Sequence, residues 1–167
     1  MAAFPDELGL GSAAATLAGK SVQHIGFVVA DLGSALNALA AMPGIPVSEP
    51  ITLDLGPDEL DVGEPVRLRL AFAMLGGLMA EFIEPSEGAN VWSRALRDRG
   101  PGLHHVAFTE VAAFDDVVRA STAAGFTRTV AGHFGEDRWC YLEQGPLVVE
   151  LTSGEGPAGR FAPGGTR

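Results

Sequence analysis

The order of predicted secondary structure repeats once along the chain, and this internal repeat limits the possible folds more than any other feature of the sequence. Segments rich in β-branched and apolar residues predict strands, and apolar residues at helical spacing predict helices. The first copy has a strand, a helix and three strands, at residues 22–30, 32–42, 51–55, 66–74 and 78–83. The second copy has the same order, at residues 102–109, 114–124, 126–134, 138–143 and 147–152. The sequence therefore predicts an α+β fold made of two β-α-β-β-β modules.

The repeat also divides the chain into parts. Residues 21–88 and 102–153 form the two predicted modules, and residues 89–101 form a connecting helix. Residues 1–20 are rich in Ala and Gly, and residues 154–167 are rich in Gly and Pro. Such compositions bury little apolar surface, so we expect a flexible extension at each end.

Length, charge and cysteine content narrow the class of protein further. The 167 residues fit one ordinary domain, and 21 acidic against 11 basic side chains give a net charge of −10. This charge disfavours nucleic acid and anionic membranes as partners. No apolar run approaches the ~20 residues of a membrane-spanning helix, and the N-terminus lacks the basic region of a secretory signal. Cys140 is the only cysteine, which excludes an internal disulfide, so we expect a cytoplasmic protein.

Each module carries one histidine on its first strand and one glutamate on its last strand. Alignment of the copies matches Gln23-His24-Ile25-Gly26-Phe27 with His104-His105-Val106-Ala107-Phe108, and Ala80-Glu81-Phe82-Ile83 with Val149-Glu150-Leu151-Thr152. The histidine and glutamate are 57 residues apart in the first copy and 45 in the second. An acidic insertion before Val66 accounts for the difference.

Strand alternation brings these four residues to one surface. If Ile25, Phe27 and Val29 pack against the helices, His24 faces the opposite side, and the same count places His105 with it. A glutamate inside an apolar strand is costly unless it is paired or bound to a metal. The sequence therefore predicts a divalent first-row metal site with the ligands His24, Glu81, His105 and Glu150.

Further residues are candidates for supporting roles. The repeat favours His105 over His104 as the ligand, which leaves His104 to orient a ligand, to pack, or to line the substrate pocket. Trp139 and Tyr141 share one face of a late strand and are the better pocket candidates, although aromatic residues at such positions are more often core. Cys140 then points to the packed side, where a thiol is inert.

Four segments of the sequence resemble the vicinal oxygen chelate superfamily, which includes glyoxalase I, methylmalonyl-CoA epimerase, extradiol dioxygenases and bleomycin or fosfomycin resistance proteins. They are HIGFVVADL at 24–32, EFIEP at 81–85, RGPGLHHVAF at 99–108 and VVELT at 148–152. The resemblance covers about residues 22–153 and is strongest to the glyoxalase-like, epimerase-type branch. GLHHVAF together with EFIEP is fairly specific for that branch.

The resemblance implies a fold, a cofactor and a chemistry. The fold is an eight-stranded, incompletely closed barrel around a divalent Mn, Fe, Co, Ni or Zn ion, with His24, Glu81, His105 and Glu150 as ligands. Such an ion withdraws charge from a carbonyl of a small substrate, so that the neighbouring carbon loses a proton and the enolate is stabilised. Glu150, or Glu81 when displaced from the metal, would be the base. Family members are often dimers, which implies a homodimer.

Two departures separate the sequence from methylmalonyl-CoA epimerases. Those enzymes usually have Gln at the position of Glu81, and the set of two histidines and two glutamates resembles bacterial glyoxalase I instead. The acidic segment 45–64 aligns no residue with the base of the epimerases, and the last hairpin is short. Both departures weaken the case for a CoA-thioester substrate.

The main hypothesis is therefore a metal-dependent isomerase or lyase of epimerase or glyoxalase type, acting through an enolate on a small oxygen-chelating substrate. One alternative is a natural-product pathway enzyme that rearranges or cyclises a polyketide or aromatic substrate. Another is a non-catalytic protein that binds a drug-like molecule. An extradiol dioxygenase is disfavoured because Glu81 would occupy an oxygen position.

Overall fold

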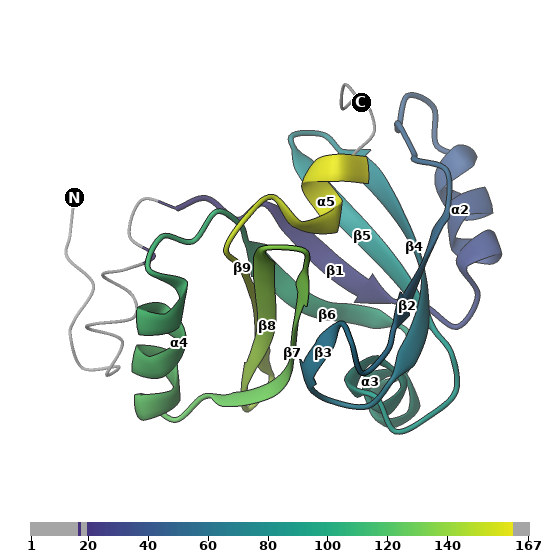
Figure 1. The fold of residues 1–167 in the computed structure, drawn as a ribbon. Coiled ribbons are helices and arrows are strands. Elements are labelled where there is room, and N and C mark those ends of the chain that lie inside the picture. Colours follow the sequence, from purple (N-terminus) through teal and green to yellow (C-terminus); the bar gives the residue numbers. More distant parts are fainter. Residues whose placement is uncertain (1–16, 18–19, 162–167) are drawn as a thin grey trace.

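The computed structural model describes residue 17 and residues 20–161, and it contains the two expected runs of secondary structure (Figure 1). The first half of the fold consists of β1 (His24–Val28), α2 (Leu32–Ala40), β2 (Ile51–Leu55), β3 (Leu60–Val62), β4 (Val66–Leu75) and β5 (Leu78–Pro85). The helix α3 (Val91–Arg99) leads to the second half. That half consists of β6 (Gly102–Phe108), α4 (Phe114–Ala123), β7 (Thr127–Phe134), β8 (Asp137–Gln144), β9 (Leu147–Thr152) and a short helix α5 (Gly156–Phe161).

All strands belong to one mixed sheet with the order β2-β4-β5-β1-β6-β9-β8-β7-β3. In each half the first strand pairs in parallel with the last, as β1 with β5 and β6 with β9. The two halves meet where β1 and β6 pair antiparallel, at the middle of the sheet. The predicted α+β fold of paired modules is confirmed.

The strand β3 is a ninth strand that the sequence analysis did not predict. It pairs with β7 at one edge of the sheet, while β2 lies at the other edge. Only residues 56–59 separate β2 from β3 along the chain. The two edges must therefore lie close together, because the five steps from Leu55 to Leu60 span at most ~18 Å. This connection curls the sheet into the nearly closed barrel that the family resemblance implies.

The main core lies inside this barrel. Leu68, Leu70 and Ile83 are buried there together with Trp92 and Tyr141. A second apolar cluster packs α4 against the outer side of the second half.

The packing of β1 differs from the expectation. The face that bears His24, Gly26 and Val28 is buried, whereas Ile25 and Phe27 are only half-buried. Phe27 stacks on Phe82 of β5, with 5.4 Å between ring centres, rather than being buried under a helix. The expected face for His24 is nevertheless correct, because alternation alone separates it from Phe27.

The ends of the chain were predicted to be flexible. Residues 1–16 and 18–19 lie outside the described residues, as do residues 162–167. Within the predicted C-terminal tail, however, α5 folds over one end of the barrel (Figure 1). Ala158 of this helix is buried against Phe72 and Met79. Among the described residues, no helix is both long and apolar enough to span a membrane.

Candidate metal centre

The strand register places the two histidines and two glutamates in adjacent rows across the middle of the sheet. One row runs Glu81, Gly26, His105 across β5, β1 and β6. The other runs His24, Ala107, Glu150 across β1, β6 and β9. In each row a small residue separates the histidine from the glutamate, so both long side chains can lean over it.

Gly26 is needed for this arrangement. A Cβ atom added at Gly26 would lie 2.5 Å from Nε2 of His105 and closer still to Cε1 and Nδ1 of the same ring. The imidazole of His105 therefore occupies the space directly above the backbone of β1. This explains why the two modules differ at these equivalent positions, with Gly26 in one and Ala107 in the other.

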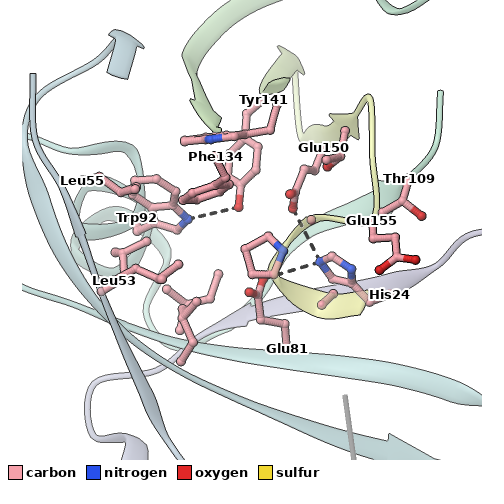
Figure 2. Close-up of a pocket in the computed structure, with 18 residues that line it drawn as sticks. His24, Leu53, Leu55, Glu81, Trp92, Thr109, Phe134, Tyr141, Glu150 and Glu155 are labelled. Atoms are coloured by element: carbon pink, nitrogen blue, oxygen red, sulfur yellow. Dashed lines mark hydrogen bonds and ion pairs between the residues drawn. The ribbon is translucent and has the colours of Figure 1, made fainter. Parts of the chain in front are cut away.

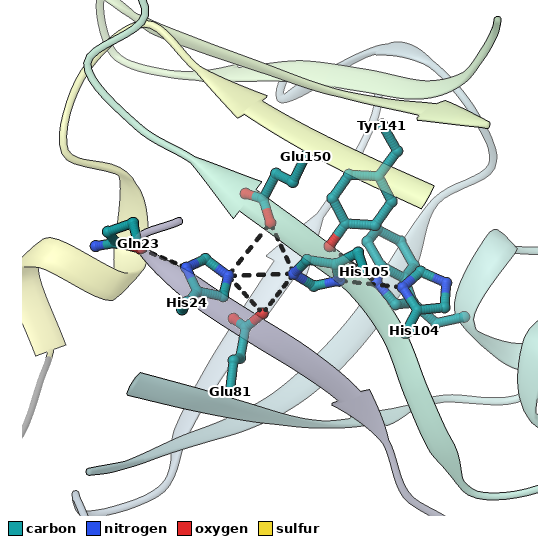
Figure 3. A network of polar contacts seen from close by, with 8 residues as sticks. Gln23, His24, Glu81, His104, His105, Tyr141 and Glu150 are labelled. Atoms are coloured by element: carbon teal, nitrogen blue, oxygen red, sulfur yellow. Dashed lines mark hydrogen bonds and ion pairs between the residues drawn. The ribbon is translucent and has the colours of Figure 1, made fainter. Parts of the chain in front are cut away.

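The ligand atoms of His24, Glu81, His105 and Glu150 lie within 4.8 Å of one another. Figure 3 shows the four side chains pointing toward a common centre. Nε2 of His24 is 3.1 Å from Nε2 of His105, and the distances from these nitrogens to the carboxylate oxygens are 3.0–3.5 Å. All four residues are buried, with at most 8% of the residue exposed. The structure thus brings together the four residues that the sequence singled out.

These separations fit a metal ion. Nitrogen and oxygen ligands lie ~2.1 Å from a first-row divalent ion, so two ligands are ~3.0 Å apart at a right angle and ~3.4 Å apart at a tetrahedral angle. The distances in the cluster fall in the same range. Two imidazoles and two carboxylates are also a donor set that such ions accept. The residues present therefore fit a divalent metal.

The electrostatics of the cluster are also consistent with a bound divalent metal. Burial acts to lower the pKa of His24, but hydrogen bonds and charges from Glu150 and Glu81 raise it to about 10. Burial acts to raise the pKa of Glu150, but His105 and His24 hold it below its ordinary value. Two buried carboxylates thus require positive charge beside them, which protonated imidazole or a divalent cation can supply.

The residue that precedes each cluster histidine orients its ring. Nδ1 of His24 is hydrogen-bonded to Oε1 of Gln23. Since an amide oxygen only accepts, Nδ1 carries the hydrogen and Nε2 points into the cluster. In the second half, Nδ1 of His105 lies 3.1 Å from Nδ1 of His104. Gln23 was not predicted as a site residue, although the repeat aligned it with His104.

His104 reaches His105 because β6 has a bulge. Gly26 pairs with His105 and Phe27 with Leu103, which leaves His104 as the extra residue. His104 is buried, and its ring centre is 5.4 Å from that of His105 and 5.5 Å from that of Tyr141. Burial, followed by the charges of His105 and Arg99, lowers the pKa of His104 to about 3. The ring is therefore neutral and can accept a hydrogen bond from His105.

The two glutamates have different neighbours across the sheet. Glu81 pairs with Phe72 of β4, and Glu150 pairs with Tyr141 of β8. Burial, followed by the charges of Glu150 and Glu81, holds the pKa of Tyr141 well above its ordinary value, so its hydroxyl remains protonated and is available as a donor. Trp92 donates its indole N–H to the same hydroxyl oxygen at 3.3 Å. Glu150 thus has a phenol opposite it, where Glu81 has a phenyl ring.

A pocket that is partly open to solvent adjoins the cluster, with about 460 Å³ of unfilled space when the open solvent within its bounds is included (Figure 2). His24, Glu81 and Glu150 line one part of it, and leucines of β2 and β4 line another. Trp139 and Tyr141 line the cavity as well, whereas His104 lies outside it, beside α3. Residues 156–158 of α5 form part of the wall.

Two other residues singled out in the sequence lie away from this chemistry. Cys140 is buried among apolar side chains of the second cluster, and burial raises its pKa to about 12. His133 is partly exposed and lies 4.0 Å from Asp61. In the described residues, the metal-ligand cluster includes none of the carboxylates of residues 45–64.

Similar folds occur in known structures. Methylmalonyl-CoA epimerase from Mycobacterium tuberculosis has a TM-score of 0.58 and 22% identity, over 78% of this chain and 85% of that one. A variant of the Streptomyces coelicolor enzyme, in complex with 2-nitronate-propionyl-CoA, has a TM-score of 0.59 and 18% identity, over 82% and 96%. A mutant of 4-hydroxymandelate synthase from Streptomyces coelicolor has a TM-score of 0.55 and 20% identity, over 80% of this chain and 48% of that one. At these identities the likeness shows the fold.

Comparison with curated protein sequences gives no match. A family model does match, over residues 23–141, which is more than half of the chain and includes His24, Glu81 and His105. The match confirms the family resemblance found in the sequence motifs. The chain belongs to the glyoxalase/bleomycin resistance protein/dioxygenase superfamily.

Proposed function

We propose that the protein is a divalent-metal-dependent isomerase or lyase that removes a proton from a carbon next to a carbonyl group of a small substrate. The observation that carries this proposal is the buried cluster of two imidazoles and two carboxylates beside a cavity. Membership of the superfamily supports a metal-dependent enzyme. The chemistry of the cluster supports the reaction class.

His24, His105, Glu81 and Glu150 would hold the metal, which can be Mn, Fe, Co, Ni or Zn. The bound ion would draw charge from a carbonyl oxygen and so make the neighbouring C–H more acidic. Gln23 and His104 fix the two imidazole rings through their Nδ1 atoms. Because the imidazole rings are held in this way, a carboxylate of the cluster would be the group that transfers the proton.

Of the two carboxylates, Glu81 is the better candidate for the base. Glu150 lies 3.0 Å from Nε2 of His105 and has the phenol of Tyr141 opposite it on β8. Glu81 lies 3.5 Å from both imidazole nitrogens and has only a phenyl ring beside it on β4. A carboxylate that is held less firmly can turn toward a substrate C–H, take its proton and later return it to the enolate. Glu150 would then remain a fixed ligand.

Hydrogen exchange tests this proposal. The metal-loaded protein is incubated in D₂O with a panel of 2-oxo acids and 2-methyl-3-oxo thioesters, and loss of the α-proton signal is followed by NMR. We expect exchange with at least one compound, and a loss of about 10²- to 10⁴-fold in Glu81→Gln, whose metal content stays close to that of the wild type. Glu136→Gln, at an exposed turn, is the matched control.

Three results would count against the proposal. Absence of a divalent metal after loading would exclude the metal-dependent mechanism. Unchanged exchange in both Glu81→Gln and Glu150→Gln would exclude a base in this cluster. Tight binding of an aromatic or cationic compound without exchange would favour a non-catalytic binding protein.

The homodimer and the cytoplasmic location also remain proposals, which rest on the sequence and its family. Light scattering of the purified protein and fractionation of the source cells test them.

A further inference from the structure

Two buried polar groups in the cavity have no hydrogen-bond partner among the described residues. They are the indole Nε1 of Trp139 and the hydroxyl Oγ1 of Thr152. Trp139 is 4% exposed and Thr152 is 1% exposed, and both line the cavity next to the metal-ligand cluster. A buried donor without a partner costs roughly 1–3 kcal/mol. We therefore expect these two groups to form hydrogen bonds with a ligand.

The two residues that carry these groups are neighbours across the sheet. Trp139 and Thr152 are directly paired across β8 and β9. Thr152 follows Glu150 by two residues on the same face of β9, so the step between them is about 6.6 Å. Likewise, Trp139 is two residues from Tyr141 on β8. The pair is thus one step along the barrel from the metal-ligand cluster.

The wall around this pair is apolar and aromatic. Phe134 stacks on Trp139, with ring centres 5.8 Å apart and planes at 17°. Tyr141 lies edge-on to Trp139 at 6.0 Å. The α5 segment at residues 156–158 completes this part of the cavity.

The charges of the cavity limit the ligand further. No Lys or Arg lines it in the described part of the chain, and its charged side chains include Glu81, Glu150 and Glu155. Unless a bound metal offsets these carboxylates, an anionic group such as a phosphate or a carboxylate would be repelled there. The lining of the cavity thus favours a ligand group that is neutral, compact and largely apolar.

We propose that Trp139 and Thr152 form a substrate subsite that binds a neutral aromatic ketone-type group, with both side chains donating hydrogen bonds to an oxygen of the substrate. This inference rests on the proposed function for the identity of the site as catalytic. The substrate then has one chelating end at the metal-ligand cluster and one acceptor oxygen about the width of a ring away.

Binding of three fluorinated probes tests the subsite. The probes are 4-fluoroacetophenone, which is neutral and has an acceptor oxygen, 1-ethyl-4-fluorobenzene, which has none, and 4-fluorobenzoate, which is anionic. Dissociation constants are measured by ¹⁹F NMR on the full chain, both metal-loaded and treated with a chelator. We expect the ketone to bind more tightly than the hydrocarbon, and the benzoate to bind most weakly.

Variants separate the hydrogen bonds from the apolar walls. Thr152→Val and Trp139→Phe each remove a donor and keep most of the side chain. We expect each to weaken binding of the ketone about five- to tenfold, which corresponds to one hydrogen bond, with the hydrocarbon changed less than about twofold. Thr122→Val, on an exposed face of α4, is the matched control and should bind all three probes like the wild type.

The results overturn the proposal if both variants bind the ketone as tightly as the wild type, or if the benzoate binds as well as the ketone. Binding of the ketone that depends on Thr152 in a protein that takes up no metal supports the subsite. That result would refute the proposed metal-dependent function instead, so the two failures are distinguishable.

Discussion

Substitution of Gly26 by alanine is the sharpest test of how the fold builds the cluster. The added Cβ atom would lie 2.5 Å from Nε2 of His105, whereas ordinary contacts begin near 3.4 Å. The ring must therefore move by at least about 0.9 Å, or the strands β1 and β6 must separate. Metal–ligand distances vary by only about 0.2 Å, so a shift of this size removes His105 from a common centre.

We expect Gly26→Ala to lower metal affinity by at least about 100-fold, because loss of a ligand costs no less than loss of a group that orients one. Overpacking should also reduce the free energy of unfolding by about 1–3 kcal/mol. Metal affinity is measured by competition with a chelator, and unfolding by urea with circular dichroism.

A matched control separates the two effects. Gly33 lies in α2, and a Cβ added there meets only Oδ1 of Asp31, at 3.4 Å. Gly33→Ala should therefore keep wild-type metal affinity and unfold at equal or higher urea concentration. If Gly26→Ala folds and binds metal as tightly as Gly33→Ala does, His105 is not a ligand and the assignment of the cluster is wrong.

Three further predictions concern other parts of the structure. Tyr141→Phe removes the hydroxyl opposite Glu150 and should lower metal affinity about 10- to 100-fold in the chelator assay; an unchanged affinity would show that the phenol does not anchor this carboxylate. Gly132→Ala would overlap the carbonyl oxygen of Glu59. It should detach β3 and cost about 1–3 kcal/mol in urea unfolding, and wild-type hydrogen exchange in β3 would contradict this. Because burial raises the pKa of Cys140 to about 12, the thiol stays protonated at pH 8 and should not react with a disulfide reagent until the protein unfolds; reaction in native buffer at the rate of free cysteine would contradict its burial.

The sequence predicted the elements and the cluster because both depend on local patterns. Alternation along β1 and β6, together with the repeat, was sufficient to place His24 and His105 on one face. The strand β3 escaped prediction because three residues in an acidic loop carry no periodicity, and their partner β7 lies some 70 residues away along the chain. Tertiary pairing alone defines that strand.

Other features depend on contacts that a pattern does not encode. The helix α5 contains Gly156, Pro157 and Gly159, which favour turns, and it is held by the burial of Ala158 in the first half of the barrel. The bulge at His104 breaks strict alternation, so counting residues could not show that His104 contacts the ring of His105. The unpartnered groups of Trp139 and Thr152 become visible only once every hydrogen bond around them is known.

The two rows of the cluster explain why a duplicated module needs both copies to form this site. The row of Glu81 ends on His105 of the other half, and the row of Glu150 ends on His24 of the other half. Each half alone offers one histidine and one glutamate, too few for a four-ligand centre. The two halves differ at the residue that pairs with each carboxylate. Phe72 pairs with Glu81, and Tyr141 pairs with Glu150. A symmetric frame thus holds two carboxylates in unequal surroundings, which is what a division between a fixed ligand and a mobile base requires.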